Sequence, residues 1–128
     1  VDPGIISTNS TPSSDVSVLI KNCTFLYNYT ADTPLFGSLT TQNNNTFYKF
    51  DNCKFEYNKG VWGGYVYGGF ISGSSVTLTN CVFRNNAFYY MFIHISNLDA
   101  TNCVFTQNST LYPFYDNVAS ETVNCVFY

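Results

Sequence analysis

Apolar and polar residues alternate along much of this chain with a period of two, the pattern of a β-strand with one buried face. The clearest example is Val16-Ser17-Val18-Leu19-Ile20. No stretch has the longer period of an amphipathic helix. The pattern therefore predicts short strands, at residues 16–20, 35–39, 47–50, 63–71, 76–78, 88–95 and 111–115, and residues 123–128 begin a further unit of the same pattern.

A four-residue pattern, Asn-Cys-x-Phe, occurs five times, and the steps between successive cysteines in the numbering are 30, 28, 22 and 22. An internal repeat of this kind without a helical face is typical of a parallel β-solenoid, whose coils stack at about 4.8 Å. The two longer steps then indicate coils with loop insertions. Residues 40–46 are one such polar loop.

Within each repeat, Cys and the Phe two positions later point to the same side of a strand. We place both inside the solenoid. The Asn before each Cys, and the Asn five positions after it in four copies, are expected to form bends and to hydrogen-bond from coil to coil. The predicted core columns are Cys23, Cys53, Cys81, Cys103, Cys125, Phe25, Phe55, Phe83, Phe105 and Phe127, and the second Asn is Asn28, Asn58, Asn86 or Asn108.

The sequence thus predicts an all-β fold, a right-handed parallel β-helix (solenoid) of about five coils at residues 16–128. Its handedness follows from the general preference of parallel strand crossovers. Residues 1–15 are rich in Ser, Thr, Pro and Gly and form an extended lead-in. Completing a neighbouring subunit is one role for that segment.

Composition excludes several kinds of partner. Charged residues make up 10% of the chain, the net charge is −3 and Arg84 is the single arginine, so nothing provides a basic surface for nucleic acid or anionic membranes. No apolar run reaches the about 20 residues needed to cross a bilayer. His94 lies in an apolar run, where we expect a hydrogen-bonded structural role rather than a catalytic or metal-binding one.

Five Asn-x-Ser/Thr sequons suggest a secreted glycoprotein, although some are explained by chance and by the repeated Asn. Two of them, Asn9 and Asn44, fall in polar stretches and are the favoured sites of N-linked glycans. Asn28 and Asn108 come next, and Asn22 is the least favoured.

All five cysteines occupy one repeat position, which favours a column of buried free thiols over disulfides. Equivalent residues in stacked coils have parallel Cβ atoms, slightly too far apart for a bridge without distortion. Because the chain has no Cys-x-x-Cys pair, zinc binding is disfavoured further.

The segments Cys81-Val82-Phe83-Arg84-Asn85-Asn86 and Gly63-Gly64-Tyr65-Val66-Tyr67 resemble the right-handed parallel β-helix (pectin-lyase-like) superfamily. The repeats are most similar to those of polymorphic outer membrane proteins. The resemblance implies an extracellular or surface location. Members of that superfamily include adhesins as well as polysaccharide lyases, so it implies no single function.

A lyase would need clustered carboxylates and a basic residue, but Asp51, Asp99 and Glu121 precede their Cys by two, four and four residues, so the three do not form one stacked cluster. We therefore expect no enzymatic activity, cofactor or metal site. A cell-surface adhesin or carbohydrate-binding module is the alternative function. It would use exposed aromatic residues, among them Trp62, Tyr65, Tyr67, Tyr89, Tyr90 and Tyr112.

The structural hypothesis is that uncapped coil ends stack head to tail into an extracellular filament, as separate subunits or as units of a longer tandem chain. Joining the chain end to the next Val1 gives a Cys125-to-Cys23 step of 26, between the observed 22 and 30. Five coils at about 4.8 Å predict an axial repeat of roughly 24 Å. The predicted interface residues are Val1, Ile5, Ile6, Val18, Ile20, Val126, Phe127 and Tyr128.

Overall fold

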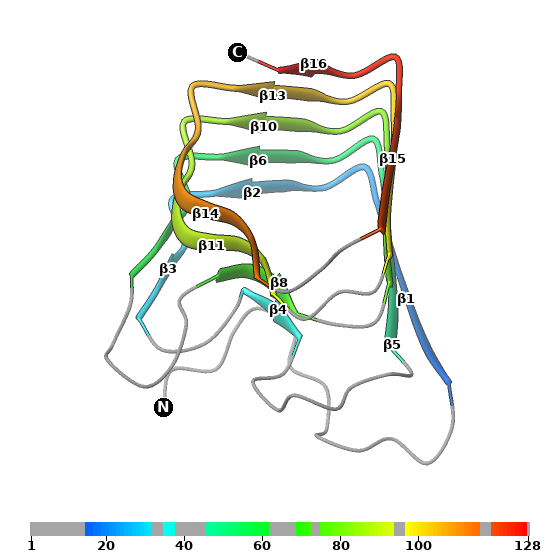
Figure 1. The fold of residues 1–128 in the computed structure, drawn as a ribbon, viewed down its shortest axis with the longest axis horizontal. Helices are drawn as coiled ribbons and strands as arrows, with labels where there is room; N and C mark the ends of the chain where they lie inside the picture. The colour runs from blue at the N-terminus through cyan, green and yellow to red at the C-terminus, as the bar shows by residue number, and fades with distance from the viewer. Residues whose placement is uncertain are drawn as a thin grey trace.

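The computed structural model describes residues 15–31, 35–37, 46–61, 69–72, 75–93, 97–115 and 119–127. All of its strand pairs are parallel, and the strands form three sheets around one core (Figure 1). We number the coils 1 to 5 from the N-terminal side; coils 1 to 4 contribute to all three sheets in turn, and the described strands of coil 5 belong to the first two. The prediction of an all-β parallel β-helix of about five coils is confirmed.

The first two sheets contain one strand from every coil. The first sheet is β1 (Val16–Lys21), β5 (Thr46–Asp51), β9 (Ser75–Thr79), β12 (Asn97–Thr101) and β15 (Ala119–Val123). The second is β2 (Thr24–Leu26), β6 (Lys54–Glu56), β10 (Val82–Arg84), β13 (Val104–Thr106) and β16 (Val126–Phe127). In Figure 1 the strands of the second sheet lie one above another, from β2 to β16.

The third sheet shows where the longer coils take up their extra residues. It contains β3 (Tyr29–Thr30), β4 (Phe36–Gly37), β7 (Lys59–Gly60), β8 (Gly69–Ser72), β11 (Ala87–Ile93) and β14 (Ser109–Tyr115). The single strand β11 pairs with both β7 and β8 of coil 2. Residues 61–68 separate β7 from β8, whereas only Tyr89 lies between the corresponding positions of β11. The longer Cys-to-Cys step of coil 2 therefore comes from residues inserted in the middle of its third-sheet segment.

Both corners of the second sheet depend on residues in the left-handed conformation. The Asn before each Cys has φ between 51° and 56°, as predicted; these residues are Asn22, Asn52, Asn80, Asn102 and Asn124. The second bend was predicted at the Asn five positions after Cys, and this is wrong by one position. The left-handed residue there is the preceding one, Tyr27, Tyr57, Asn85 or Gln107. Asn28, Asn58, Asn86 and Asn108 hydrogen-bond between coils instead.

The core is a stack of inward side chains at the interval of the coils. Ring centroids in the Phe column are 5.0 Å apart for Phe25–Phe55, 4.6 Å for Phe55–Phe83, 4.8 Å for Phe83–Phe105 and 4.9 Å for Phe105–Phe127. The rings are within 14° of parallel, so each face packs on the next. Phe36 of coil 1 meets this column edge to face. Aromatic packing along the solenoid axis thus supplies much of the buried apolar area.

The last repeat enters a fifth coil as predicted. Val123 ends β15 and Val126 begins β16, with the bend at Asn124 between them. Much of the predicted strand 63–71 lies outside the described residues. No helix among the described segments is long and apolar enough to cross a membrane.

Candidate functional site

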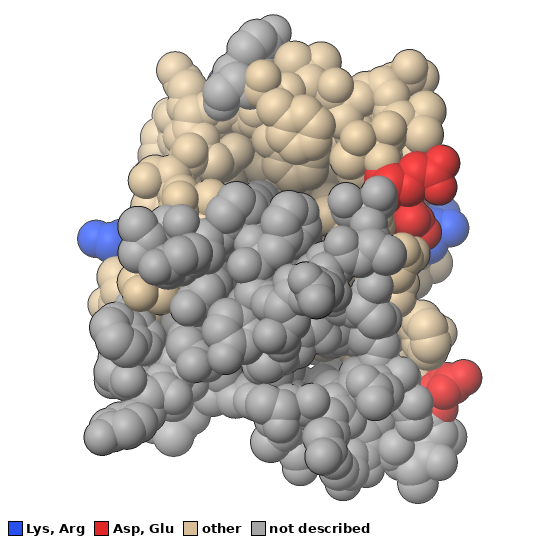
Figure 2. Space-filling view, in the orientation of Figure 1, with Lys and Arg blue, Asp and Glu red and all other residues tan. Residues whose placement is uncertain are grey.

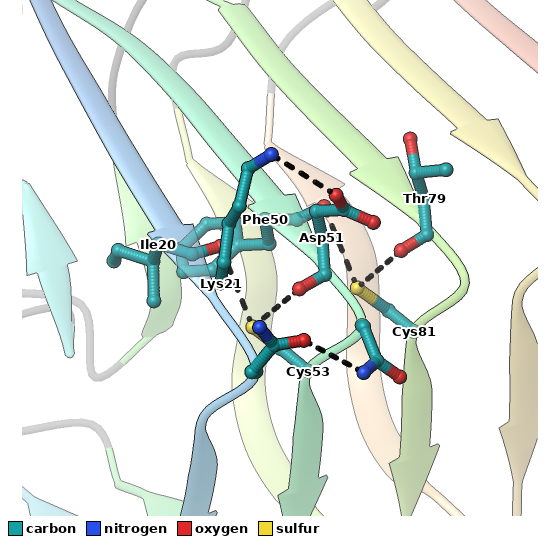
Figure 3. A network of polar contacts seen from close by, with 9 residues as sticks. Ile20, Lys21, Phe50, Asp51, Cys53, Thr79 and Cys81 are labelled. Carbon is teal, nitrogen blue, oxygen red and sulfur yellow. Dashed lines mark hydrogen bonds and ion pairs between the residues drawn. The ribbon is translucent and has the colours of Figure 1, made fainter.

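The five cysteines form a column at the corner between the first and second sheets, and all are free. Figure 3 shows the thiols of Cys53 and Cys81 beside the backbone carbonyl oxygens that accept their hydrogen bonds. The Sγ of Cys53 lies 3.4 Å from the Asp51 carbonyl oxygen and 3.5 Å from that of Ile20. Cys81 makes the corresponding contact with Thr79 at 3.3 Å. Because weak S–H donors meet carbonyl acceptors here, the column is packed without disulfides.

Neighbouring thiols in this column differ in acidity. Burial raises the pKa of the Cys53 thiol. A hydrogen bond between Cys81 and Cys103, together with burial, raises the pKa of Cys81. The same hydrogen bond lowers the pKa of Cys103 to about 7, and burial opposes this shift. Both thiols of the pair are fully buried, so the bond acts inside the core.

Four Asn side chains, which we call the inner ladder, join the coils at the corner between the second and third sheets: Asn28, Asn58, Asn86 and Asn108. Nδ2 of Asn86 donates to Oδ1 of Asn108 at 2.9 Å and to the Phe55 carbonyl at 2.8 Å. Oδ1 of Asn86 accepts from both the backbone N–H and Nδ2 of Asn58, at 3.0 and 2.9 Å. Asn58 and Asn86 are buried, and these bonds satisfy their amide groups.

The Asn residues that precede the cysteines form a second, exposed set of side-chain hydrogen bonds, the outer ladder, which joins Asn22 to Asn52 and, separately, Asn80 to Asn102 and Asn124. Here the residue of the later coil donates. Nδ2 of Asn52 lies 2.8 Å from Oδ1 of Asn22, and Asn124 reaches Asn102 at 3.3 Å. In the inner ladder the earlier coil donates. The two ladders therefore run in opposite directions along the stack.

At the C-terminal end of the described stack, Phe127 continues the Phe column but is 61% exposed. Cys125 beside it is half-buried. No described residue donates to Oδ1 of Asn124. This end consequently presents an open aromatic face, an exposed strand edge at β15 and β16, and a hydrogen-bond acceptor.

The N-terminal end of the described stack is the counterpart of this surface. Val18, Ile20, Cys23 and Phe25 are only partly buried, although they pack against the core. Nδ2 of Asn22 has no acceptor among the described residues. Both ends thus expose residues that coils 2 to 4 bury. Val18, Ile20, Val126 and Phe127 of the predicted interface lie at these two ends, and Val1, Ile5, Ile6 and Tyr128 lie outside the described residues.

Three of the five sequons are described, and their side chains differ in availability. Nδ2 of Asn28 donates to Asn58 at 2.8 Å, and Nδ2 of Asn108 donates to the Phe83 carbonyl at 2.9 Å. A glycan on either nitrogen would compete with the inner ladder. Asn22 is exposed and uses only Oδ1 in its ladder bond, so it is the most available of the three. The favoured sites Asn9 and Asn44 lie outside the described residues.

Two separate ion pairs join charged residues of the described segments. Lys21 lies 3.5 Å from Asp51, and Arg84 lies 2.8 Å from Glu56. Asp99 is opposite Glu121 in the first sheet. Asp51 is aligned with Thr79, two positions further along the strand than Thr77, which is opposite Asp99. In the described part of the chain, no group of three His, Cys, Asp or Glu residues could hold a metal ion. Charges in Figure 2 lie at the lateral margins of the face shown. His94 lies outside the described residues.

One aromatic residue from the predicted binding set lines a hollow. This depression of about 320 Å³ lies on the third sheet and includes Lys59, Ala87, Tyr89 and Ser109. Tyr90 and Tyr112 are opposite each other in β11 and β14. Trp62, Tyr65 and Tyr67 lie outside the described residues.

Sequence analysis missed the exposed pair Tyr27 and Tyr57, whose rings stack at 5.2 Å. The repeat contains the information needed, because the residue before the second Asn is Tyr in the first two coils but Asn85 or Gln107 in the next two.

Comparisons with models of known protein families, with curated proteins and with solved structures found no significant match to this chain.

Proposed function

We propose that the chain is a non-enzymatic structural module of an extracellular filament or surface fibre, and that its β-helix ends stack head to tail. The observation that carries the proposal is the complementarity of the two ends. One end offers Oδ1 of Asn124, and the other offers Nδ2 of Asn22. In a head-to-tail contact, Nδ2 of Asn22 in the next copy would donate to Oδ1 of Asn124. This bond would have the same direction as those within the outer ladder, where the Asn of the later coil donates.

Apolar contact supports the same arrangement. Phe127 is 61% exposed at one end and Phe25 is half-buried at the other. A new coil would place a ring on Phe127, as Phe127 itself stacks on Phe105. Burial of an aromatic face in this way is favourable. It would also pair the open edge of β15 and β16 by strand addition. The two ends are unlike surfaces, so the contact is heterologous and generates a filament.

The third sheet has no described strand in coil 5. In this proposal, residues 1–15 of the next copy fill that position before its own coil 1 begins. The step of 26 from Cys125 to the next Cys23 lies within the range of the other steps. Successive units of a longer chain would stack in the same way. Similarity of the repeats to the pectin-lyase-like superfamily, and to polymorphic outer membrane proteins within it, supports a secreted or cell-surface location with N-linked glycans on the sides.

Two exposed phenylalanines provide the test. Electron microscopy and light scattering of the unmodified chain should show filaments with an axial repeat of roughly 24 Å. Phe127→Lys should abolish them, because it places a charge on the end of the Phe column. Phe47→Lys is the matched control on the side of the first sheet, where Phe47 is 41% exposed. Monodisperse particles at high concentration, or equal assembly by the two variants, would contradict the proposal.

The hollow on the third sheet favours a second candidate function, carbohydrate binding by a surface adhesin. Its volume of about 320 Å³, with Tyr89 beside Lys59 and Ser109, provides an aromatic ring and polar groups. A glycan array tests this alternative. Binding that is lost in Ser109→Trp, which fills the hollow, would favour it.

A further inference from the structure

Tyr27 and Tyr57 lie in adjacent coils at the corner between the second and third sheets. Their ring centroids are 5.2 Å apart and their planes differ by 17°. Tyr27 is 73% exposed and Tyr57 is 44% exposed. The pair is therefore a stack of two phenols outside the core, unlike the buried Phe column.

The backbone at both tyrosines is in an unfavourable conformation. Tyr27 has φ 55° and Tyr57 has φ 56°, a region that Asn and Gly enter far more readily than aromatic residues. The next coil has Asn85 at this position. The left-handed bend belongs to the corner itself, because Asn85 and Gln107 share it, but the choice of an aromatic residue there does not. Since both rings are exposed, core packing does not account for that choice.

Hydrogen bonds between coils hold the two tyrosines in register. The backbone N–H of Tyr27 donates to the Glu56 carbonyl at 3.3 Å, and that of Tyr57 donates to the Arg84 carbonyl at 3.1 Å. The inner ladder fixes the adjacent Asn28 and Asn58 at 2.8 Å. The backbones of the two tyrosines therefore keep the spacing of adjacent coils, so the two exposed phenols stay within reach of each other.

We infer that Tyr27 and Tyr57 are a site of oxidative cross-linking to dityrosine by a haem peroxidase and hydrogen peroxide. Each phenol gives up one electron and one proton and becomes a phenoxyl radical. The two radicals form a carbon–carbon bond between ortho carbons, and the two ortho hydrogens move to the oxygens and restore both phenols. Overall, two tyrosines and one hydrogen peroxide give one dityrosine and two waters.

The stacked geometry favours this coupling within one molecule. Two freely moving radicals must meet by diffusion, whereas these rings are already face to face. The new bond would join coil 1 to coil 2 at the same sequence separation as Asn28 and Asn58, which is 30. A closed loop of this length restricts the unfolded chain and so stabilises the first two coils. The inference does not depend on filament formation.

The experiment treats the full chain with peroxidase and hydrogen peroxide as an equal mixture of unlabelled and ¹⁵N-labelled protein. We expect dityrosine fluorescence and a linked peptide pair containing Tyr27 and Tyr57, lighter by two hydrogens. The pair should occur only with both peptides labelled or both unlabelled, because the link forms within one molecule. Pairs of mixed label, or a different pair of tyrosines, would overturn the inference.

Tyr29 provides the matched control. It is 59% exposed, two positions from Tyr27, and stands opposite Lys59 rather than another tyrosine. Tyr27→Phe and Tyr57→Phe should each abolish the linked pair, whereas Tyr29→Phe should leave its yield unchanged. These substitutions retain the rings, so unaltered circular dichroism should accompany all three. Equal loss in all three variants would contradict a role for the stack.

Discussion

Coils 1 and 2 differ from coils 3 and 4 although all four contain the same Cys, Phe and Asn columns. The first pair has Cys-to-Cys steps of 30 and 28 and a third sheet divided into short strands. The second pair has two steps of 22 and the continuous strands β11 and β14. In coils 3 and 4 the left-handed corner residue is Asn85 or Gln107, whereas in coils 1 and 2 it is Tyr27 or Tyr57.

This difference separates what the repeat requires from what it tolerates. The segment from the Asn before Cys to the Asn five positions after it keeps its length in all four complete coils. Its two left-handed corners and two ladders leave no room for an extra residue. The third face accepts insertions because a strand can be interrupted there and resumed in register, at a small cost in loop entropy.

The largest expected effect comes from removing a buried member of the inner ladder. Asn86→Ala in coil 3 deprives the backbone N–H and Nδ2 of Asn58 of their acceptor and removes a donor to the Phe55 carbonyl. Unpaired buried polar groups cost about 1–3 kcal/mol each, so unfolding in urea should show a loss of about 3 kcal/mol or more.

Asn28→Ala in coil 1 is the control for this ladder. It removes one side-chain bond, while the backbone N–H of residue 28 still donates to Oδ1 of Asn58. The expected loss is below about 1 kcal/mol. Equal losses at Asn28 and Asn86 would show that the ladder does not distinguish the two halves.

The thiol column should distinguish Cys103 of coil 4 from Cys53 of coil 2 by pH. The hydrogen bond with Cys81 lowers the folded-state pKa of Cys103 to about 7 from 9.0, so its contribution to stability is complete above pH 9 and is lost as the pH falls from 9 through 7. Cys53 of coil 2 behaves oppositely: its pKa is raised by burial, so stability falls as the pH rises above 9.

Urea unfolding of Cys53→Ala and Cys103→Ala at several pH values measures these contributions. The cavity left by either substitution costs the same at every pH, so only a change of slope reports on ionisation. Cys103→Ala should remove the gain between pH 7 and 9, and Cys53→Ala should reduce the loss above pH 9. Parallel pH curves for the two variants would refute the assignment.

Exchanging the corner residue of coil 2 for that of coil 3 has a smaller effect. Tyr57→Asn relieves a left-handed aromatic residue, worth about 1 kcal/mol, but also removes a stack worth roughly 0.5–1 kcal/mol. The net change in the unmodified chain should be close to zero. In a Tyr27→Asn background no stack remains to be lost, so Tyr57→Asn should stabilise by about 1 kcal/mol. A thermodynamic cycle of the four proteins measures this coupling, and a coupling of zero would show that the rings do not interact.

The sequence was sufficient to predict the architecture because the repeat places chemically similar residues at one position in every coil. The parallel sheets and the left-handed Asn before each Cys follow from that pattern. It was insufficient at the second corner. Asn58 and Asn86 were assigned the left-handed conformation from their residue type, but buried amides bridging the coils are worth more than a favourable bend, so the preceding residue takes the strain. The exposure of a single Phe cannot be read from the motif either, because Phe127, which is exposed, has the same motif as the buried Phe83.

The smallest effect concerns the two ion pairs that cross between coils. Arg84 of coil 3 lies 2.8 Å from Glu56, whose side chain is 16% exposed, whereas Lys21 of coil 1 lies 3.5 Å from the more exposed Asp51. Exposed pairs contribute about 0.2–1 kcal/mol, and the closer, less hydrated one belongs at the upper end of this range. Arg84→Gln should therefore cost about 0.5–1 kcal/mol in urea unfolding at low salt, and Lys21→Gln less than about 0.3 kcal/mol. High salt should reduce the first value, because screening weakens a partly exposed pair. If Lys21→Gln cost as much as Arg84→Gln, the charge pairs would join coil 1 to coil 2 as firmly as coil 2 to coil 3, and the difference between the two halves would lie only in their corners and insertions.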